Sequence, residues 1–167
     1  MAKQLKKETA QQMLIGGGIV ATLGANNKII NDGAVVVEGS KIKEIGKTAA
    51  LKKKYPKAKF VDAKNKLVIP GFINTHMHLY STFARGLGKA APSCNFPEIL
   101  KNLWWRLDKK LNMDDVYYSA VLPLVDCIKN GTTTIIDHHA SPNSITGSLD
   151  TIAKACKKAG IRANLCY

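Results

Sequence analysis

Apolar residues in the first part of the chain form short runs separated by turn-forming residues. Asn31-Asp32-Gly33 precedes the run at 34–37, and Glu38-Gly39-Ser40-Lys41 leads into the alternating segment 42–45. Short runs with a period of two, bounded by Asn, Asp and Gly, predict half-buried β-strands. Further strands are predicted at 13–15, 19–21 and 60–63, and a short helix at 48–55. We therefore predict a small β-sandwich-like module over residues 13–69.

From Pro70 onward the pattern changes to strands that alternate with helices. The short apolar segment 68–73 suits a strand of a parallel sheet that is buried on both faces. Apolar side chains then recur at helical spacing and predict an amphipathic helix: Phe96, Ile99, Leu100, Leu103, Trp104, Leu107 and Leu111.

A second helix is predicted to begin after Asn112 and to end at Gly131. Asn is a favoured N-cap and Gly a common C-terminal stop, while Pro123 should kink the helix between them. The remaining predicted elements are a strand at 132–137, a helix capped by Ser148 and ended by Gly160, and a strand at 161–167.

This order of elements predicts the α/β class, with a parallel sheet and right-handed crossovers. A closed barrel of eight β/α units takes roughly 250 residues, whereas residues 70–167 provide three strands. We therefore expect the first three strands of an incomplete (β/α)8 barrel over 70–167. The chain is then expected to be the N-terminal part of a longer enzyme.

A His-x-His pattern, His76-Met77-His78, stands where the first of these strands ends. Side chains at i and i+2 of an extended chain point to the same side, so two imidazoles there can bind one metal ion. Neutral imidazole binds zinc well, with iron and manganese left open. The pair is common by chance, but here it ends a buried strand and precedes a long loop, as at the active face of a parallel barrel. The pattern predicts His76 and His78 as metal ligands.

Several motifs resemble one enzyme superfamily. Residues 70–78, Pro-Gly-Phe-Ile-Asn-Thr-His-Met-His, resemble the first-strand motif of the amidohydrolase superfamily. Residues 83–87 (Phe-Ala-Arg-Gly-Leu) and 130–134 (Asn-Gly-Thr-Thr-Thr) resemble its branch that contains guanine deaminase, the chlorotriazine hydrolases and the adenosine-analogue deaminases. Residues 103–108 and 137–143 are similar to the SsnA-type aminohydrolases.

The resemblance implies a metal-dependent hydrolase that acts on carbon–nitrogen bonds other than peptide bonds. The substrate would be a purine- or pyrimidine-like N-heterocycle, and the reaction a deamination or related hydrolysis. In that chemistry a divalent metal, zinc in the first place, lowers the pKa of a water molecule, and a carboxylate carries a proton to the leaving nitrogen. The resembled enzymes take further ligands and the carboxylate from later strands, so no catalytic residue is assigned here. The 167-residue chain alone is expected to be inactive.

Asp137-His138-His139 follows the second predicted barrel strand, at the same end of the sheet as the His-x-His pair. By the period-two rule, one of the adjacent histidines faces inward and the other away. The cluster could contact substrate, support a ligand histidine through a hydrogen bond, or be a loop pair with no ligand. We assign His139 and Asp137 to substrate binding, with His139 preferred.

Asp108 is the third predicted substrate-binding residue. It lies near the position at which the resembled enzymes place a substrate-contacting carboxylate, although a plain surface acid would need no ligand. Trp105 and Arg106 lie off the apolar stripe of their predicted helix and could face a pocket.

The net charge is +13, from 25 basic and 12 acidic residues. Such a charge admits an anionic partner such as nucleic acid. The lysines are scattered and are not interleaved with aromatic residues, so we favour a lysine-rich surface. A basic nucleic-acid-binding protein and a non-enzymatic metal-binding fragment are the two alternatives to the hydrolase.

Composition also bounds the setting of the protein. Four widely spaced cysteines without a Cys-x-x-Cys pair suit a reducing cytoplasm. No apolar run approaches the roughly 18 residues of a membrane helix, so no membrane partner is expected. Residues 1–12 are rich in Lys and Gln, and we expect them to be a disordered extension. The expected partner is a small N-heterocyclic substrate, and a homo-oligomer of the complete enzyme stays open.

Overall fold

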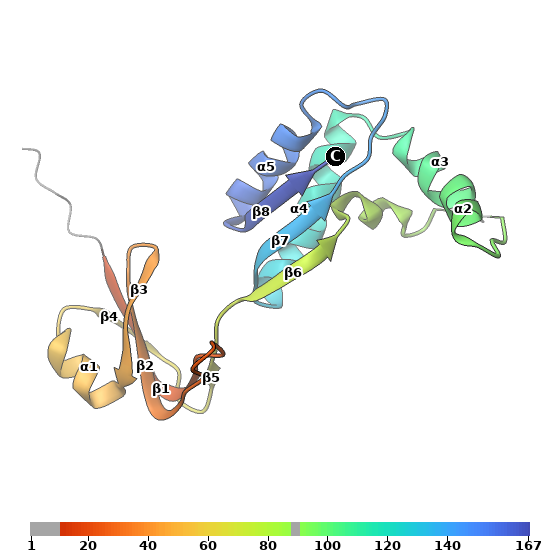
Figure 1. Cartoon of the computed structure of the whole chain (residues 1–167). Helices are drawn as coiled ribbons and strands as arrows, with labels where there is room; N and C mark the ends of the chain where they lie inside the picture. The colour runs from red at the N-terminus through yellow and green to blue at the C-terminus, as the bar shows by residue number, and fades with distance from the viewer. Residues whose placement is uncertain (1–10, 88–90) are drawn as a thin grey trace, which may run out of the picture. The chain divides into compact units, whose positions relative to one another are not determined.

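A computed structural model describes residues 11–87 and 91–167 (Figure 1). The chain divides into two compact units, and the boundary falls between Pro70 and Gly71. Most of the predicted extension at 1–12 lies outside the described residues. Its last residue, Gln12, begins strand β1, so at this position the prediction of disorder is wrong.

The first unit is one mixed sheet whose strands follow the order β3-β2-β1-β4, with β5 also pairing with β1. β1 is antiparallel to β2 and parallel to β4 and β5. The elements are β1 (Gln12–Ala21), β2 (Ile29–Glu38), β3 (Lys41–Lys47), α1 (Thr48–Lys54), β4 (Lys59–Asp62) and β5 (Leu67–Val68). All five described strands join one sheet, rather than the two facing sheets of a sandwich.

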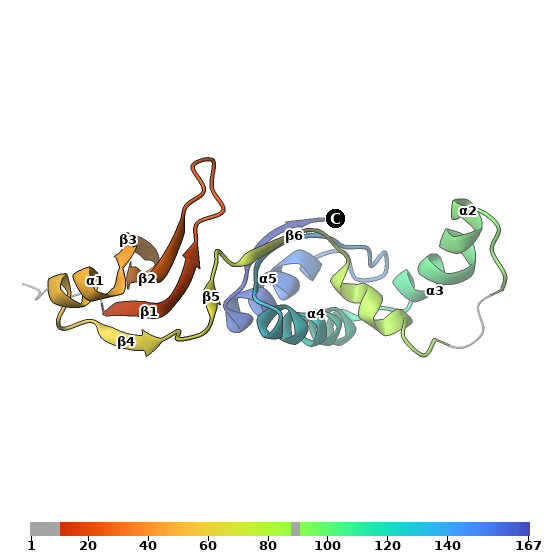
Figure 2. The ribbon, with the colours of Figure 1, turned by 90° about the horizontal axis from the view of Figure 1, so that it is seen from below.

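A small apolar cluster holds this first unit together. Leu14 of β1, Ala34 and Val36 of β2 and Leu51 of α1 are each at most 3% exposed. Leu14 and Val36 lie opposite each other in the β1–β2 register, so alternate residues of the strands face the helix, as the period of two predicts. Figure 2 shows α1 lying against β1 and β3.

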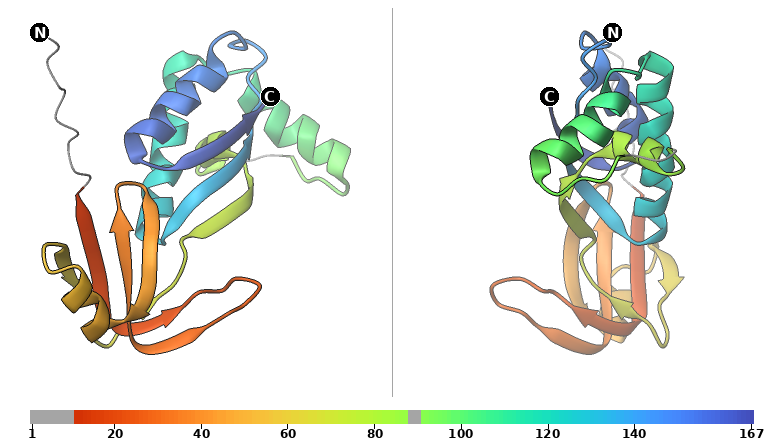
Figure 3. Two further views of the ribbon diagram at one scale, coloured as in Figure 1. Left: turned by 60° about the vertical axis from the view of Figure 1, so that its left-hand side comes forward. Right: turned by 90° about the vertical axis from the view of Figure 1, so that its right-hand side faces the viewer.

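The second unit is a parallel sheet in the order β6-β7-β8. Its strands lie side by side in Figure 3, and α4 and α5 cover one face of the sheet in Figure 2. The elements are β6 (Phe72–Met77), the 3-10 helix η1 (Leu79–Ala84), α2 (Phe96–Ile99), the π-helical turn η2 (Leu100–Trp104), α3 (Trp105–Asp108), α4 (Met113–Lys129), β7 (Thr132–His138), α5 (Ser148–Ala159) and β8 (Arg162–Cys166). Three parallel strands with two covering helices confirm the predicted open part of a barrel.

The main core lies between this sheet and its helices. It includes Ile135 at the centre of β7, Leu124 on α4 and Ile152 on α5, which are each at most 1% exposed. Cys127 and Cys156 are also buried there, as small core residues. The opposite face of the sheet carries exposed apolar side chains, among them Ile73 and Ile136.

The helix boundaries follow from capping. Asn112 accepts a hydrogen bond from the backbone N–H of Asp115, and the Asp115 carboxylate accepts one from the N–H of Asn112, which is a capping box. α4 continues through Pro123 to Lys129. α5 differs from the prediction, because Gly147 is its N-cap and Ser148 its first helical residue.

The single helix predicted over 96–111 is divided into α2, a π-helical turn and α3. The insertion of a π turn rotates the following residues relative to an ideal α-helix. Phe96 and Ile99 before the π turn are exposed, whereas Leu107 and Leu111 after it are buried. The apolar stripe therefore packs only at its C-terminal end.

Gly71, just before β6, leaves no room for a side chain. A Cβ at this position would lie 2.2 Å from Cγ2 and 2.6 Å from Oγ1 of Thr133 on β7. Threonine is branched at Cβ and stiff, so it cannot move aside freely. Gly71→Ala should lower the free energy of unfolding by about 1–3 kcal/mol, measured by urea titration.

The Thr133→Ala background is the control for this substitution. Of the three nearest atoms, it removes Cγ2 and Oγ1 and leaves the Cβ, 2.9 Å from the new methyl group. The cost of Gly71→Ala should therefore shrink in that background. An equal cost in both backgrounds would contradict the steric explanation.

Candidate metal centre

The two histidines of the His-x-His pattern meet at the C-terminal end of β6. His76 lies in the strand and His78 directly follows it. Their Nε2 atoms are 3.1 Å apart, with the ring planes at 89°. Both side chains are exposed, whereas Met77 between them packs against the core. The alternation of the strand thus brings both imidazoles to the face of the sheet opposite the helices.

A hydrogen bond fixes the tautomer of His78. Its Nδ1 lies 3.0 Å from the backbone carbonyl oxygen of His138. A carbonyl oxygen only accepts, so Nδ1 carries a proton, and in the neutral imidazole Nε2 then carries the lone pair. This is the arrangement that orients a histidine for metal binding through Nε2.

The spacing of the two Nε2 atoms fits one shared metal ion. Two nitrogens bound to zinc at 2.0–2.1 Å with a tetrahedral angle lie roughly 3.3 Å apart, close to the 3.1 Å found here. No third donor completes the site, because the described residues contain no group of three His, Cys, Asp or Glu side chains suited to one metal. The pair therefore fits two of the three protein ligands that a catalytic zinc site needs.

The adjacent histidines after β7 point to opposite sides, as predicted. His138 is exposed, and its ring lies 5.5 Å from that of His78. His139 is 1% exposed. The sequence predicted His139 as a substrate-binding residue, and strand alternation places its neighbour His138 on the face of the sheet that carries the His-x-His pair.

Asp137 is completely buried at the end of β7. Its Oδ1 accepts a hydrogen bond of 2.7 Å from the backbone N–H of Leu79, while its Oδ2 has no partner among the described residues. Burial raises the pKa of Asp137, and the Leu79 N–H and the charges of His78 and His138 oppose that rise. Asp137 therefore contacts the chain directly after His78 rather than facing solvent.

His139 lies in a pocket of aromatic and hydroxyl groups. Its Nε2 is 2.9 Å from Ser141 Oγ, and that hydroxyl donates its proton to the carbonyl oxygen of Ser144. The His139 Nε2–H must then donate to Ser141, which leaves a lone pair on Nδ1 without a partner in the described chain. Burial, with a smaller contribution from His138, lowers the pKa of His139 to about 4.

Tyr80 has aromatic neighbours on both sides of the candidate site, and the charges of Asp108 and Asp137 act on it. Its ring lies 5.4 Å from that of His139, 6.3 Å from that of His78 and 6.2 Å from that of Trp104. Burial, together with Asp108 and Asp137, raises the pKa of Tyr80 to about 12. Strand periodicity could not predict these contacts, because Tyr80 lies in the 3-10 helix η1.

Asp108, at the end of α3, is 7% exposed. Its Oδ1 has no hydrogen-bond partner among the described residues. Burial raises the pKa of Asp108, while Tyr80 opposes that effect. Asp108, Asp137 and His139 are therefore all buried, and among the described residues one polar atom of each has no hydrogen-bond partner.

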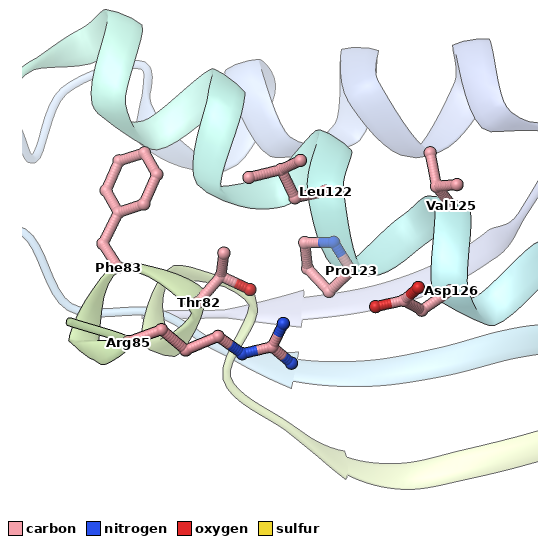
Figure 4. A pocket seen from close by; sticks show the side chains of 7 residues that line it. All are labelled: Thr82, Phe83, Arg85, Leu122, Pro123, Val125 and Asp126. Carbon is pink, nitrogen blue, oxygen red and sulfur yellow. The ribbon is translucent and has the colours of Figure 1, made fainter.

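Two surface hollows in the described part of the chain lie away from these residues. One hollow of about 490 Å³ lies between η1 and α4, where Arg85 and Asp126 flank apolar side chains (Figure 4). A second, of about 580 Å³, is lined by Trp105 and Arg106, in agreement with the expectation that these two residues face a pocket. None of the predicted site residues lines either hollow.

Comparison with known proteins identifies the class. The model of the amidohydrolase family matches residues 67–167, more than half of the chain. The chain belongs to the amidohydrolase family. A second model, the imidazolonepropionase-like composite domain of bacteria, matches residues 33–58 in the first unit.

Two relatives are identical to this chain at about a third of the aligned positions. The 5'-deoxyadenosine deaminase of Methanocaldococcus jannaschii is 38% identical over 133 residues, which cover 80% of this chain and 29% of that protein. The 5-methylthioadenosine/S-adenosylhomocysteine deaminase of Syntrophomonas wolfei is 32% identical over 157 residues, covering 92% and 33%. The chain thus spans about a third of the length of these relatives.

Solved structures share the fold. Atrazine chlorohydrolase TrzN from Arthrobacter aurescens, in complex with zinc and atraton, superposes with a TM-score of 0.77 at 24% identity, covering 93% of this chain and 35% of that one. Guanine deaminase from C. acetobutylicum with bound guanine gives a TM-score of 0.75 at 24% identity, covering 93% and 36%. No helix in the described part of this chain is long and apolar enough to cross a membrane.

Proposed function

We propose that this chain provides the first two metal ligands of a metal-dependent hydrolase that deaminates an N-heterocyclic substrate. The observation that carries the proposal is the pair of Nε2 atoms 3.1 Å apart on the open face of the sheet. Support also comes from the relatives, which are named as deaminases of adenosine derivatives.

His76 and His78 are the proposed ligands, and zinc is the proposed metal, with iron or manganese as the alternatives. The donor set fits, because both groups are imidazoles and His78 already has the tautomer that binding through Nε2 requires. A bound divalent metal supplies Lewis acidity and lowers the pKa of water. The chain's own part is to hold the two rings at the right spacing on a rigid strand.

On the substrate side we propose His139 and Asp108 as hydrogen-bonding groups, with Asp137 as a further candidate. His139 Nδ1 and Asp108 Oδ1 are buried and unpartnered in the described chain, so each has an unused acceptor for an N–H or O–H of a polar ring. Since all three residues are less than 10% exposed, substrate contact requires the segments around Tyr80 to open. The cytoplasmic setting, the absence of a nucleic-acid partner and a homo-oligomer stay predictions.

Ammonia release tests this function. The protein purified from the cells that make it, loaded with zinc, should release ammonia from a panel of adenosine derivatives, guanine and pyrimidines. The His76→Ala/His78→Ala variant should release none, because the metal is lost. The 167-residue chain expressed alone should also be inactive, because it carries only two ligands.

Two results would oppose the proposal. Full activity in the double histidine variant would show that these residues do not hold the metal. Ammonia release by the isolated chain at the rate of the cell-made protein would show that two ligands suffice.

A further inference from the structure

The C-terminal end of β7 contacts His78 and Leu79 through two consecutive residues. The His138 carbonyl oxygen accepts a hydrogen bond from His78 Nδ1, at 3.0 Å. The Asp137 carboxylate accepts one from the N–H of Leu79, at 2.7 Å. The ring of His78 and the peptide that follows it are thus fixed by two neighbouring groups of another strand.

The two contacts differ in their exposure to solvent. The carbonyl contact reaches the exposed ring of His78, whereas Asp137 points to the helix side and is 0% exposed. Leu79 is itself 1% exposed, so its N–H has no access to water if the carboxylate is removed. A buried backbone N–H needs an acceptor, and Asp137 provides it at the point where the chain leaves β6.

The backbone at this point is not held by regular strand pairing. The β6–β7 register ends with Met77 opposite Asp137, and His78 has φ −133° and ψ 87° as the chain turns into η1. Beyond Met77 no further ladder bond fixes the orientation of the backbone. Instead, the carboxylate of Asp137 holds the backbone by accepting the hydrogen bond from Leu79, one residue after His78.

We propose that Asp137 is a positioning residue for the metal ligand His78. It fixes the peptide on the C-terminal side of His78 and thereby sets the distance between the two Nε2 atoms. This inference rests on the proposed function, in which His76 and His78 bind the metal. Groups that orient a ligand typically change metal affinity by about 10–100-fold when they are removed.

The experiment compares Asp137→Ala with Asp137→Asn in the cell-made protein. Alanine removes the acceptor for the Leu79 N–H, whereas the asparagine carbonyl retains it. Zinc affinity by competition titration should fall about 10–100-fold in Asp137→Ala and stay within a few-fold of wild type in Asp137→Asn. Hydrogen exchange of the Leu79 amide should be at least about 10-fold faster in Asp137→Ala only.

Ile152→Ala is the control for lost stability. Ile152 on α5 is buried nearly as deeply as Asp137, and its apolar side chain makes no hydrogen bond to either histidine. It should destabilise the protein without changing zinc affinity. If Asp137→Ala and Ile152→Ala bind zinc equally well, or if Asp137→Asn loses affinity as much as Asp137→Ala, the positioning role is overturned.

The double variant His76→Ala/His78→Ala shows whether a negative result concerns only the role of Asp137 or the proposed function as well. Zinc retained in the double variant would overturn the ligand assignment itself. Zinc lost in the double variant but kept in Asp137→Ala would overturn only the role of Asp137.

Discussion

Zinc affinity should fall by roughly four orders of magnitude when His76 and His78 are both replaced by alanine. Zinc binding at structural sites with four ligands is worth about 10–16 kcal/mol, or roughly 3 kcal/mol per ligand. One lost ligand then costs about 100-fold in affinity, and two cost about 10⁴-fold. Metal content after dialysis, measured by mass spectrometry, should drop from stoichiometric to background.

His138→Ala is the matched control for this loss. His138 is also an exposed histidine at the same end of the sheet, with its ring 5.5 Å from that of His78. Its backbone carbonyl, which orients His78, remains after the substitution. Zinc content should therefore stay close to wild type, and a loss as large as that of the double variant would make His138 a ligand.

Acid should destabilise the protein through His139. The pKa of His139 is about 4 in the folded chain and 6.5 in the unfolded one. Between these two pH values the unfolded chain binds a proton that the folded chain does not, so stability rises with pH. The free energy of unfolding is therefore not reduced by His139 above pH 6.5. It falls by up to roughly 3 kcal/mol as the pH is lowered to 4.

Asp137 and Asp108 act in the opposite direction, because burial raises their pKa values and the folded chain then binds their protons more readily. A variant is needed to isolate His139. His139→Gln keeps a donor for Ser141 and removes the titrating ring. Urea unfolding at pH 7 and pH 4.5 should show a smaller acid loss in His139→Gln than in wild type.

His138, the exposed neighbour of His139, supplies the control for this measurement. His138→Gln should lose most of the stability that the wild type loses in acid, because burial is a larger cause of the lowered pKa of His139 than His138 is. An acid loss in His139→Gln equal to that of wild type would assign the effect to other groups.

Strand alternation predicted how His76 and His78 are placed at the end of β6. Apolar residues before His76 indicated a strand, and the period of two placed His76 and His78 on one side, because a backbone in the β region leaves little choice. The same rule correctly separated His138 from His139. These features depend on local geometry alone, so the sequence was sufficient to predict them.

Other features depend on contacts between distant segments. The carboxylate of Asp137 meets the N–H of Leu79, 58 positions earlier in the chain, and no local pattern encodes that pairing. Tyr80 meets His139 and Trp104 for the same reason. The π-helical turn at Leu100–Trp104 interrupts the helical period, so the predicted apolar stripe extended further than the packing does.

The most direct test of the central claim is anomalous diffraction at the zinc edge from crystals of the zinc-loaded protein. We expect an anomalous peak on the open face of the β6-β7-β8 sheet, about 2.0–2.1 Å from Nε2 of both His76 and His78. The His78 Nδ1 should remain bonded to the His138 carbonyl oxygen. A zinc ion bound elsewhere, or bound to only one of the two histidines, would contradict the account.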